Sequence, residues 1–475
     1  MISMQRLSSL DAGFLNMETD TQQMHVGSLL MFEGPVPTFE DFSDHLASCL
    51  DSVPRYRQRV QRMPLELARP LWVDDPHFSL AYHLRHTAIP TPGGDDQLRA
   101  LVGRVMAQRL DVDRPLWELW LVEGLPGDRW AVLTKTHHAM IDGLAGNELM
   151  EIVLTRDPDR QRRVRSDIGW QPRTAPSTLE LATEAAGWAA RLPLEAGRAA
   201  AAAMRSLSSP TDLLRSLTAR AFGTAQIGRS AARPTSVLNG PLGPHRRWGW
   251  VRGDLAAVKS VKDAAGCTVN DVLLAVIAGG FGSYLSKRGE PVEDVVVRSL
   301  VPVSIRTADH QGRLGNQVTA MFADLPIAVA DPSERLDSVA RQMNHLKAGG
   351  TAVSVESMLS AADFVPATLM TLGARVFART GQRVVNTVTT NIPGPQYPLY
   401  LLGSRMLEMF PYIPVAQDVR ISIGIVSYLG QLAFGVTGDY DAVPDLDRLC
   451  DAIEATLHEM TGPGGPGRPG RRARA

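Results

Sequence analysis

Cysteine is scarce in this chain, and neither a long apolar run nor an excess of charge is present. The 475 residues include only three cysteines, Cys49, Cys267 and Cys450, which lie far apart. Such a set does not form a disulfide framework, so we expect a reducing cytoplasm. A formal net charge of −1 argues against a nucleic-acid-binding protein, which would show a strong basic bias.

Secretory and membrane-spanning patterns are not found either. The longest apolar run, about residues 272–281, contains two glycines and is too short to cross a bilayer. Residues 1–20 show no basic stretch followed by an apolar one, so we expect no signal peptide. Any contact with a membrane should therefore be peripheral.

The chain divides into two similar halves around a different middle. A hydrophobic content of 44% is ample for real cores, and the length fits two large domains or three smaller ones. Helical and strand patterns alternate in residues 1–155 and again in 236–460, which favours α/β domains with layered sheets. The tail, 461–475, is rich in Gly, Pro and Arg and is expected to be disordered.

Residue spacing predicts individual elements. The sequence predicts helices within 38–50, 98–106 and 269–277, strands within 115–122, 130–136 and 295–303, and a hairpin over 420–437 that turns at 428–431. The middle, 156–235, is rich in Ala and Arg and is broken by prolines. We favour a helical crossover that links the two domains; a basic amphipathic surface that rests on lipid is the alternative.

The most informative stretch lies at a predicted strand-to-helix corner, where His137, His138, Asp142 and Gly143 follow one another. Adjacent residues of an extended segment point to opposite faces, so only one histidine should enter a site. A neutral imidazole can take a proton from an alcohol or amine that attacks an acyl carbon. Asp142 could orient the ring or lock the corner through an arginine, and Gly143 leaves room for a ligand.

Structural roles would also explain these residues. Histidine pairs are more often packed than catalytic, and Asp142 could simply cap the next helix. Two histidines can bind a metal, but no Cys or carboxylate lies at a familiar ligand spacing, so we expect no metal site.

Further blocks accompany the motif in a fixed order. They are LSSLDAGFLNME (7–18), MHVG (24–27), PLW (115–117), HHAMIDG (137–143), ND (270–271), PVSIR (302–306), LGN (314–316) and TNIPGP (390–395). With this set the chain resembles the bacterial wax ester synthase/acyl-CoA:diacylglycerol acyltransferase family almost from end to end. The His-His motif alone is shared with the wider chloramphenicol acetyltransferase-like superfamily.

The resemblance implies a fold and a reaction. The fold would be two chloramphenicol acetyltransferase-like α/β domains with mixed sheets, joined by the helical crossover, with an active-site tunnel at their interface. His138 would be the general base that deprotonates the hydroxyl of diacylglycerol or of a long-chain alcohol. The oxygen would attack the thioester of a fatty acyl-CoA without an acyl-enzyme. Acyl-CoA is then a substrate, and no cofactor or metal is implied.

The resemblance also suggests roles around the base. His137 and Asp142 would hold the geometry of the corner, and in relatives the aspartate pairs with an arginine. The candidates for that arginine are Arg55, Arg57 and Arg306.

Other matching residues would surround the substrates. Gly143 would keep the channel clear, and Trp117 would pack under the motif. Asn270 would stand near the oxyanion or, equally, would cap the following helix. Residues 391–395 could line the channel or form a rigid turn.

Two other functions stay open at this point. One is a superfamily transferase that uses another acceptor, such as an amine; the blocks at 7–18 and 391–395 argue against it. The other is a catalytically inactive lipid-binding protein, against which the intact His138, Asp142 and Gly143 argue. The lipid substrates predict a cytoplasmic enzyme that is peripherally attached to the inner membrane or to lipid droplets.

Overall fold

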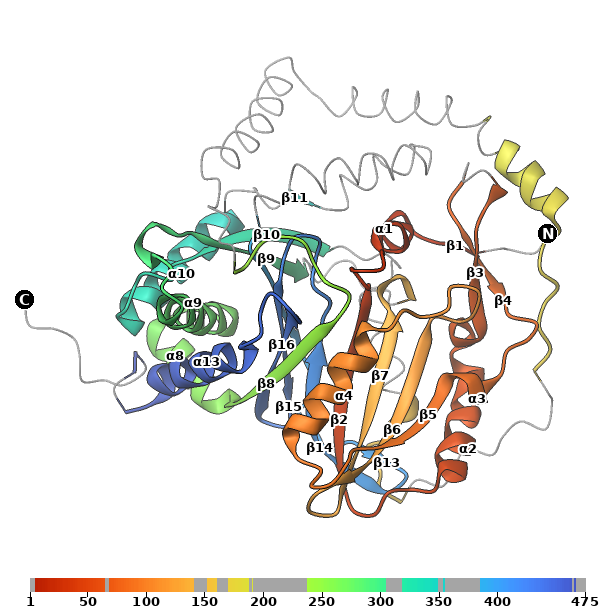
Figure 1. Ribbon diagram of the computed structural model, residues 1–475, viewed down its shortest axis with the longest axis horizontal. Coiled ribbons are helices and arrows are strands. Elements are labelled where there is room, and N and C mark those ends of the chain that lie inside the picture. Colours follow the sequence, from red (N-terminus) through yellow and green to blue (C-terminus); the bar gives the residue numbers. More distant parts are fainter. Residues whose placement is uncertain are drawn as a thin grey trace, which may run out of the picture.

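The computed structural model describes the chain in segments that include both predicted halves (Figure 1). The described residues are 5–64, 68–140, 152–159, 170–187, 190, 237–304, 318–348, 353–354, 385–463 and 465–466. Two large sheets and their covering helices account for most of them, with a small sheet at one end.

The first large sheet holds the histidine corner. Its strand order is β13-β14-β2-β7-β6-β5. The strands are β2 (His25–Glu33), β5 (Leu84–Ala88), β6 (Trp117–Leu125), β7 (Arg129–His137), β13 (Tyr400–Leu401) and β14 (Ser404–Tyr412). The sheet is mixed, because β5 runs parallel to β6 whereas β2, β6, β7 and β14 pair antiparallel.

Helices and the small sheet complete this part of the molecule. The helices are α1 (Ser9–Met17), α2 (Phe39–Cys49), α3 (Leu80–His83) and α4 (Asp95–Ala107), and the small sheet, of order β1-β4-β3, comprises β1 (Gln5–Arg6), β3 (Gln58–Gln61) and β4 (Leu71–Asp74). Short 3-10 turns lie at Leu50–Ser52, Pro54–Arg57 and His138–Met140. Thr38 caps α2 by accepting the amide of Asp41, as its sequence predicts.

The second large sheet has the order β11-β10-β9-β12-β15-β16-β8. Its strands are β8 (Arg246–Asp254), β9 (Val297–Ser304), β10 (Val318–Leu325), β11 (Val353–Ser354), β12 (Thr387–Pro393), β15 (Ile421–Tyr428) and β16 (Gln431–Asp439). Helices α8 (Leu255–Ala265), α9 (Val269–Lys287), α10 (Pro332–Ala348) and α13 (Leu446–Thr461) gather beside this sheet, and a 3-10 turn lies at Val292–Asp294 (Figure 1).

Helix α9 is the central helix of this second layer. It is apolar and long enough to span a bilayer by length and composition, but 72% of its apolar window is buried inside the protein. Its buried residues pack with α8, α10, α13 and the sheet in one core cluster. We therefore assign α9 to the core of the second half.

A strand from the second half of the sequence belongs to the first large sheet and connects the two halves. Strand β14 lies in the second half of the sequence but pairs antiparallel with β2 of the first sheet (Figure 1). Side chains of both sheets and of α4 form one apolar cluster between them. Gly435 permits the close approach, because a Cβ there would lie 1.7 Å from the Pro411 carbonyl oxygen of β14.

These elements confirm most of the predicted ones. Each predicted helix and strand is found, but α9 continues ten residues beyond the predicted 277, and α4 and β6 each extend three residues past one predicted limit. The hairpin turns at Leu429 and Gly430, both with positive φ. The mixed α/β fold with two sheet-rich parts is also as predicted. The sheets do not follow the division at residue 236, since β13 and β14 belong to the first sheet.

Several predictions concern residues that are mostly outside the described part. Of the middle, 156–235, only 156–159, 170–187 and residue 190 are described, and 178–187 form a helix. Of the predicted disordered tail, Thr461 is instead the last residue of α13, whereas 464 and 467–475 lie outside the described residues. The interface tunnel stays a prediction.

Candidate active site

The two histidines lie where β7 ends and a 3-10 turn begins. His137 is the last residue of β7 and His138 the first of the turn. The corner is held by backbone hydrogen bonds: the His137 amide donates to the Leu116 carbonyl at 2.9 Å, and the His138 amide to the Met24 carbonyl at 2.8 Å. Both neighbouring strands thus fix the position of the motif.

His138 is packed against an aromatic ring from another element. The Phe14 ring of α1 lies 3.9 Å from the His138 ring, centroid to centroid, and is tilted by 31°. Among the described residues, Nδ1 of His138 finds no hydrogen-bond partner of suitable geometry. Burial lowers the pKa of His138 below its usual 6.5, and its own backbone carbonyl opposes this only in part. The ring is therefore neutral at pH 7.

His137 faces the other side of the sheet and is fully buried. Its Nδ1 accepts the amide N–H of Ala139 at 3.0 Å, so the proton of the neutral ring is on Nε2. Burial lowers the pKa of His137 to about 3. The adjacent histidines therefore differ in surroundings, as their alternation along an extended segment predicts.

Nε2 of His137 points to a buried carboxylate. Strand pairing places His25 of β2 directly opposite His137. The Oε1 atom of Glu18, which follows α1, lies 3.3 Å from Nε2 of His25 and 3.8 Å from Nε2 of His137. The Glu18 side chain is only 3% exposed, and its Oε2 lies 3.3 Å from Nη2 of Arg109.

The ionisation of this cluster follows from its contacts. Burial raises the pKa of Glu18, but the hydrogen bond from His25 and the nearby His137 and Arg109 outweigh it and lower the pKa to about 2. Glu18 is therefore a carboxylate at pH 7. Burial lowers the pKa of His25, and the contact with Glu18 opposes that shift.

A buried ammonium group lies next to this cluster. Lys135 precedes His137 by two residues and is on the same face of β7. Its Nζ donates to the Gln108 carbonyl at 2.6 Å and lies 3.7 Å from Oε2 of Glu118. Burial lowers the pKa of Lys135 to about 8. Carbonyl oxygens at the C-terminal end of α4 thus face both groups: that of Met106 faces His25, and that of Gln108, the residue after the helix, faces Lys135.

Not all predicted site residues can be placed. Asp142, Gly143 and Arg306 lie outside the described residues. Arg55 donates to the Gln5 side chain at 2.6 Å, and Arg57 to Asp51 at 2.8 Å. The pairing of Asp142 with an arginine stays a prediction.

The alternative role predicted for Asn270 is wrong. Thr268, not Asn270, caps α9, and it forms a capping box with Asp271. Asn270 lies in the first turn of the helix and is half-buried. Its role beside the oxyanion stays a prediction.

Two further predictions have structural outcomes. Trp117 is buried as expected, and its indole N–H donates to the Tyr56 carbonyl at 2.8 Å. Residues 391–393 are not part of a turn, because they form the end of β12 beside β15.

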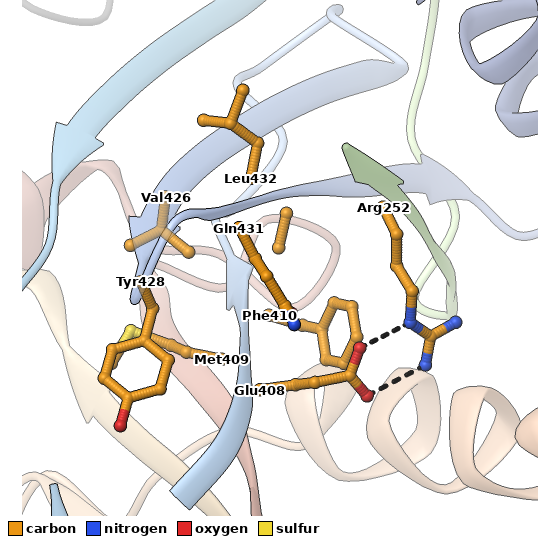
Figure 2. A pocket seen from close by; sticks show the side chains of 9 residues that line it. Arg252, Glu408, Met409, Phe410, Val426, Tyr428, Gln431 and Leu432 are labelled. Atoms are coloured by element: carbon orange, nitrogen blue, oxygen red, sulfur yellow. Dashed lines mark hydrogen bonds and ion pairs between the residues drawn. The ribbon is translucent and has the colours of Figure 1, made fainter. Parts of the chain in front are cut away.

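Two hollows within the described part are each too small to hold a substrate. Figure 2 shows one beside the Arg252–Glu408 ion pair, with Tyr428 and Phe410 in its wall. Its volume of about 10 Å³ is that of a single water site. A second, of the same volume, is apolar and includes Thr134, which is on the His138 side of β7.

Sequence reasoning missed Phe14, Glu18 and His25 as parts of the site. No local pattern places them there, because each reaches the histidine corner only through α1 or the pairing of β2 with β7. The available signal was the family resemblance of the blocks at 7–18 and 24–27, which contain these residues.

Comparison with protein families gives two matches, one in each half of the chain. The family model of the wax ester synthase/diacylglycerol acyltransferase catalytic domain matches residues 7–273. The model of the C-terminal domain of the same family matches residues 314–461.

Individual relatives match over nearly the whole chain. A protein of Mycobacterium tuberculosis H37Rv named as a probable diacylglycerol O-acyltransferase is 35% identical over 460 residues, 96% of each chain. The wax ester synthase/diacylglycerol acyltransferase of Marinobacter aquaeolei VT8 has a solved structure with 27% identity and a TM-score of 0.65, covering 96% of this chain and 98% of that one. The first condensation domain of the calcium-dependent antibiotic synthetase, 18% identical with a TM-score of 0.59 over 98% of each chain, shares the fold.

Proposed function

Since the chain belongs to the wax ester synthase/diacylglycerol acyltransferase family, we propose that it transfers a fatty acyl group from a CoA thioester to a hydroxyl of diacylglycerol or of a long-chain alcohol. The observation that supports this reaction best is the state of His138. It is a neutral imidazole, held at the end of β7 against Phe14, as a general base at neutral pH requires.

The proposed reaction has two steps. Nε2 of His138 takes the hydroxyl proton as the oxygen attacks the thioester carbonyl, and a tetrahedral oxyanion forms. The carbon–sulfur bond then breaks, the imidazolium returns the proton to the departing CoA thiolate, and the ester is released. A neutral ring with its proton on Nδ1 would leave Nε2 free as the base.

The rate enhancements expected from each catalytic effect agree with this mechanism. A thioester is already activated, so no covalent nucleophile is needed. General-base catalysis is worth about 10²–10⁴-fold, and positioning with oxyanion stabilisation has to supply the remainder. We propose Asn270 as one donor to the oxyanion, Asp142 as a support of the corner, and Gly143 as the residue that leaves space for substrate. Neither a metal nor a cofactor has a step in this reaction.

Thiol release from palmitoyl-CoA tests the proposal directly. The parent should release thiol only when dipalmitoylglycerol or hexadecanol is present, and the ratio of the two rates names the preferred acceptor class. His138→Ala should lower the rate by at least about 10²-fold. The matched control is His77→Ala, because His77 is exposed and far from the motif in sequence.

Three results would reject parts of the proposal. Activity that persists in His138→Ala would move the base elsewhere. Release with an amine acceptor and not with either alcohol would favour another transferase of the superfamily. A parent that binds lipid without turnover would favour a lipid-binding protein.

The expected cellular location follows from the substrates. Diacylglycerol and fatty alcohols reside in membranes and lipid droplets, so we propose a cytoplasmic enzyme that attaches peripherally to the inner membrane or to droplets. Flotation of the native protein with membranes at low salt supports this. Separation from membranes at both low and high salt would contradict it.

A further inference from the structure

Three buried polar atoms face one another behind the histidine corner. They are Oε1 of Glu18, Nε2 of His25 and Nε2 of His137, and none has a hydrogen-bond partner of suitable geometry among the described residues. They come from three elements: the end of α1, strand β2 and strand β7. Oε1 of Glu18 lies 3.3 Å from Nε2 of His25 and 3.8 Å from Nε2 of His137, within ion-pair distance of both, although the second contact is too long for a hydrogen bond.

The protons agree with this interpretation. His137 has its proton on Nε2, because Nδ1 accepts from Ala139. Nδ1 of His25 lies 3.2 Å from the Met106 carbonyl oxygen, so a neutral His25 ring can donate either to that oxygen or to Glu18. A doubly protonated ring would donate to both. The Glu18 carboxylate therefore lies opposite Nε2 of both rings, where either N–H would be attracted to it.

Glu18 is connected to the catalytic histidine through α1. Phe14 lies in the C-terminal half of α1, and Glu18 is the residue with extended backbone at which the helix ends. Phe14 packs on His138, whereas Glu18 faces His137 and His25. The helix and the residue that ends it therefore contact both histidines of the motif.

We propose that Glu18 is a positioning residue: its carboxylate ties the end of α1 to β2 and β7, and this tie holds Phe14 against the ring of His138. The inference rests on the proposed role of His138 as the base. Glu18 acts on position and not on charge at His138, whose pKa is set by burial and by its own carbonyl.

The groups around Glu18 allow a matched control. The charges on this side of the corner are those of Arg109, Asp20, Lys135 and Glu118. Asp20 binds Nη1 of the same arginine at 2.9 Å, is 91% exposed and has no contact with a histidine in the described structure. Asp20→Asn therefore removes one carboxylate charge from the same arginine and leaves the histidines unchanged.

The experiment compares thiol release by the parent, Glu18→Gln, Asp20→Asn, Phe14→Leu and the Glu18→Gln/Phe14→Leu double variant. We expect kcat to fall roughly tenfold in Glu18→Gln, a loss of about 1.4 kcal/mol, with KM for palmitoyl-CoA within about twofold. Asp20→Asn should behave as the parent. The double variant should be no slower than the slower single variant, because both changes act through one contact.

Two readouts separate positioning from a general loss of structure. The acid limb of the rate profile should stay at the same pH in Glu18→Gln, and Glu18→Asp, which keeps the charge, should recover part of kcat. Equal kcat in Glu18→Gln and Asp20→Asn, or losses that multiply in the double variant, would overturn the proposal. If His138→Ala abolishes turnover in the same assay, that outcome leaves the proposed function intact.

A measurement on the parent remains available if Glu18→Gln does not fold. Protein labelled with ¹⁵N-histidine should show imidazole N–H resonances of His25 and His137 that are shifted downfield by the carboxylate and protected from exchange. Each is assigned by its loss in His25→Gln or His137→Gln. Rapidly exchanging signals for both rings in the parent would overturn the proposal.

Discussion

At the level of single residues, the site depends on the protonation states of its two adjacent histidines. His137 and His138 are neighbours in sequence, but one faces a carboxylate and the other an aromatic ring. Burial keeps both neutral at pH 7 because it disfavours the charged ring. We propose that His138 is the histidine that exchanges a proton with substrate.

The pH dependence of turnover follows from the lowered pKa of His138. The base must be neutral to accept a proton, so activity is lost as the pH falls through its pKa. Because burial lowers this pKa below 6.5, the acid limb of kcat/KM should have its midpoint below pH 6.5. Thiol release between pH 5 and 8 measures it, and a midpoint above 6.5 would contradict the assignment.

Unfolding at acid pH has to be separated from this effect. Burial lowers the pKa of His83 to about 4, from 6.5. Between these values the unfolded chain binds a proton that the folded chain does not, so the free energy of unfolding falls as the pH falls below 6.5. Rates should therefore be taken with a return to pH 7 as a control for irreversible loss.

At the level of elements, helix ends and strand ends position the polar groups. Helix α4 ends with carbonyl oxygens that face His25 and Lys135, and α9 begins with the capping box of Thr268 and Asp271. Asn270 is next to that cap but takes no part in its hydrogen bonds. Substitution of Thr268 should therefore affect stability, whereas substitution of Asn270 should affect activity.

Two substitutions in α9 test this separation. Thr268→Ala removes the side chain that accepts the Asp271 amide, so the free energy of unfolding should fall by about 1 kcal/mol with kcat unchanged. Asn270→Ala should change stability little. If it donates to the oxyanion, its loss should lower kcat by about 10²–10³-fold. Urea unfolding and thiol release on both variants give the result, and an unchanged kcat in Asn270→Ala would remove it from the site.

Local patterns predicted the elements better than the site. The caps and apolar spacings of α2, α4 and α9 and the turn of the β15–β16 hairpin depend on residues that are close in sequence, so they could be predicted. Glu18 reaches His137 only because β2 pairs with β7 and α1 packs on the corner. Such contacts between distant residues leave no periodic signal in one sequence.

At the level of the whole molecule, the two halves are joined in one folded unit. Strand β14 completes the first sheet beside β2, and buried Arg246 of β8 donates to the Thr21 carbonyl in the loop between Glu18 and His25. The interface core includes apolar side chains from α4, β8, β14, β15 and β16. The second half therefore supports the loop that contains part of the histidine cluster.

Separate expression of the halves tests this dependence. Residues 1–235 alone should aggregate, because β2 would have an unpaired edge and the interface core would be exposed. Coexpression with residues 236–475 should restore soluble protein and thiol release. The control is the full chain cut after purification in the middle segment. A soluble, monomeric fragment 1–235 with a native thermal transition would contradict the prediction.

The pairing of β14 with β2 also sets an order of events during synthesis. Strand β2 ends at Glu33, but its partner β14 begins only at Ser404. At about 5–20 residues per second, a ribosome needs tens of seconds to deliver that partner. Throughout this interval the nascent chain presents an open strand edge and an uncovered apolar layer. The nascent chain therefore has to be protected from aggregation during this interval. The first sheet becomes complete only near the end of translation.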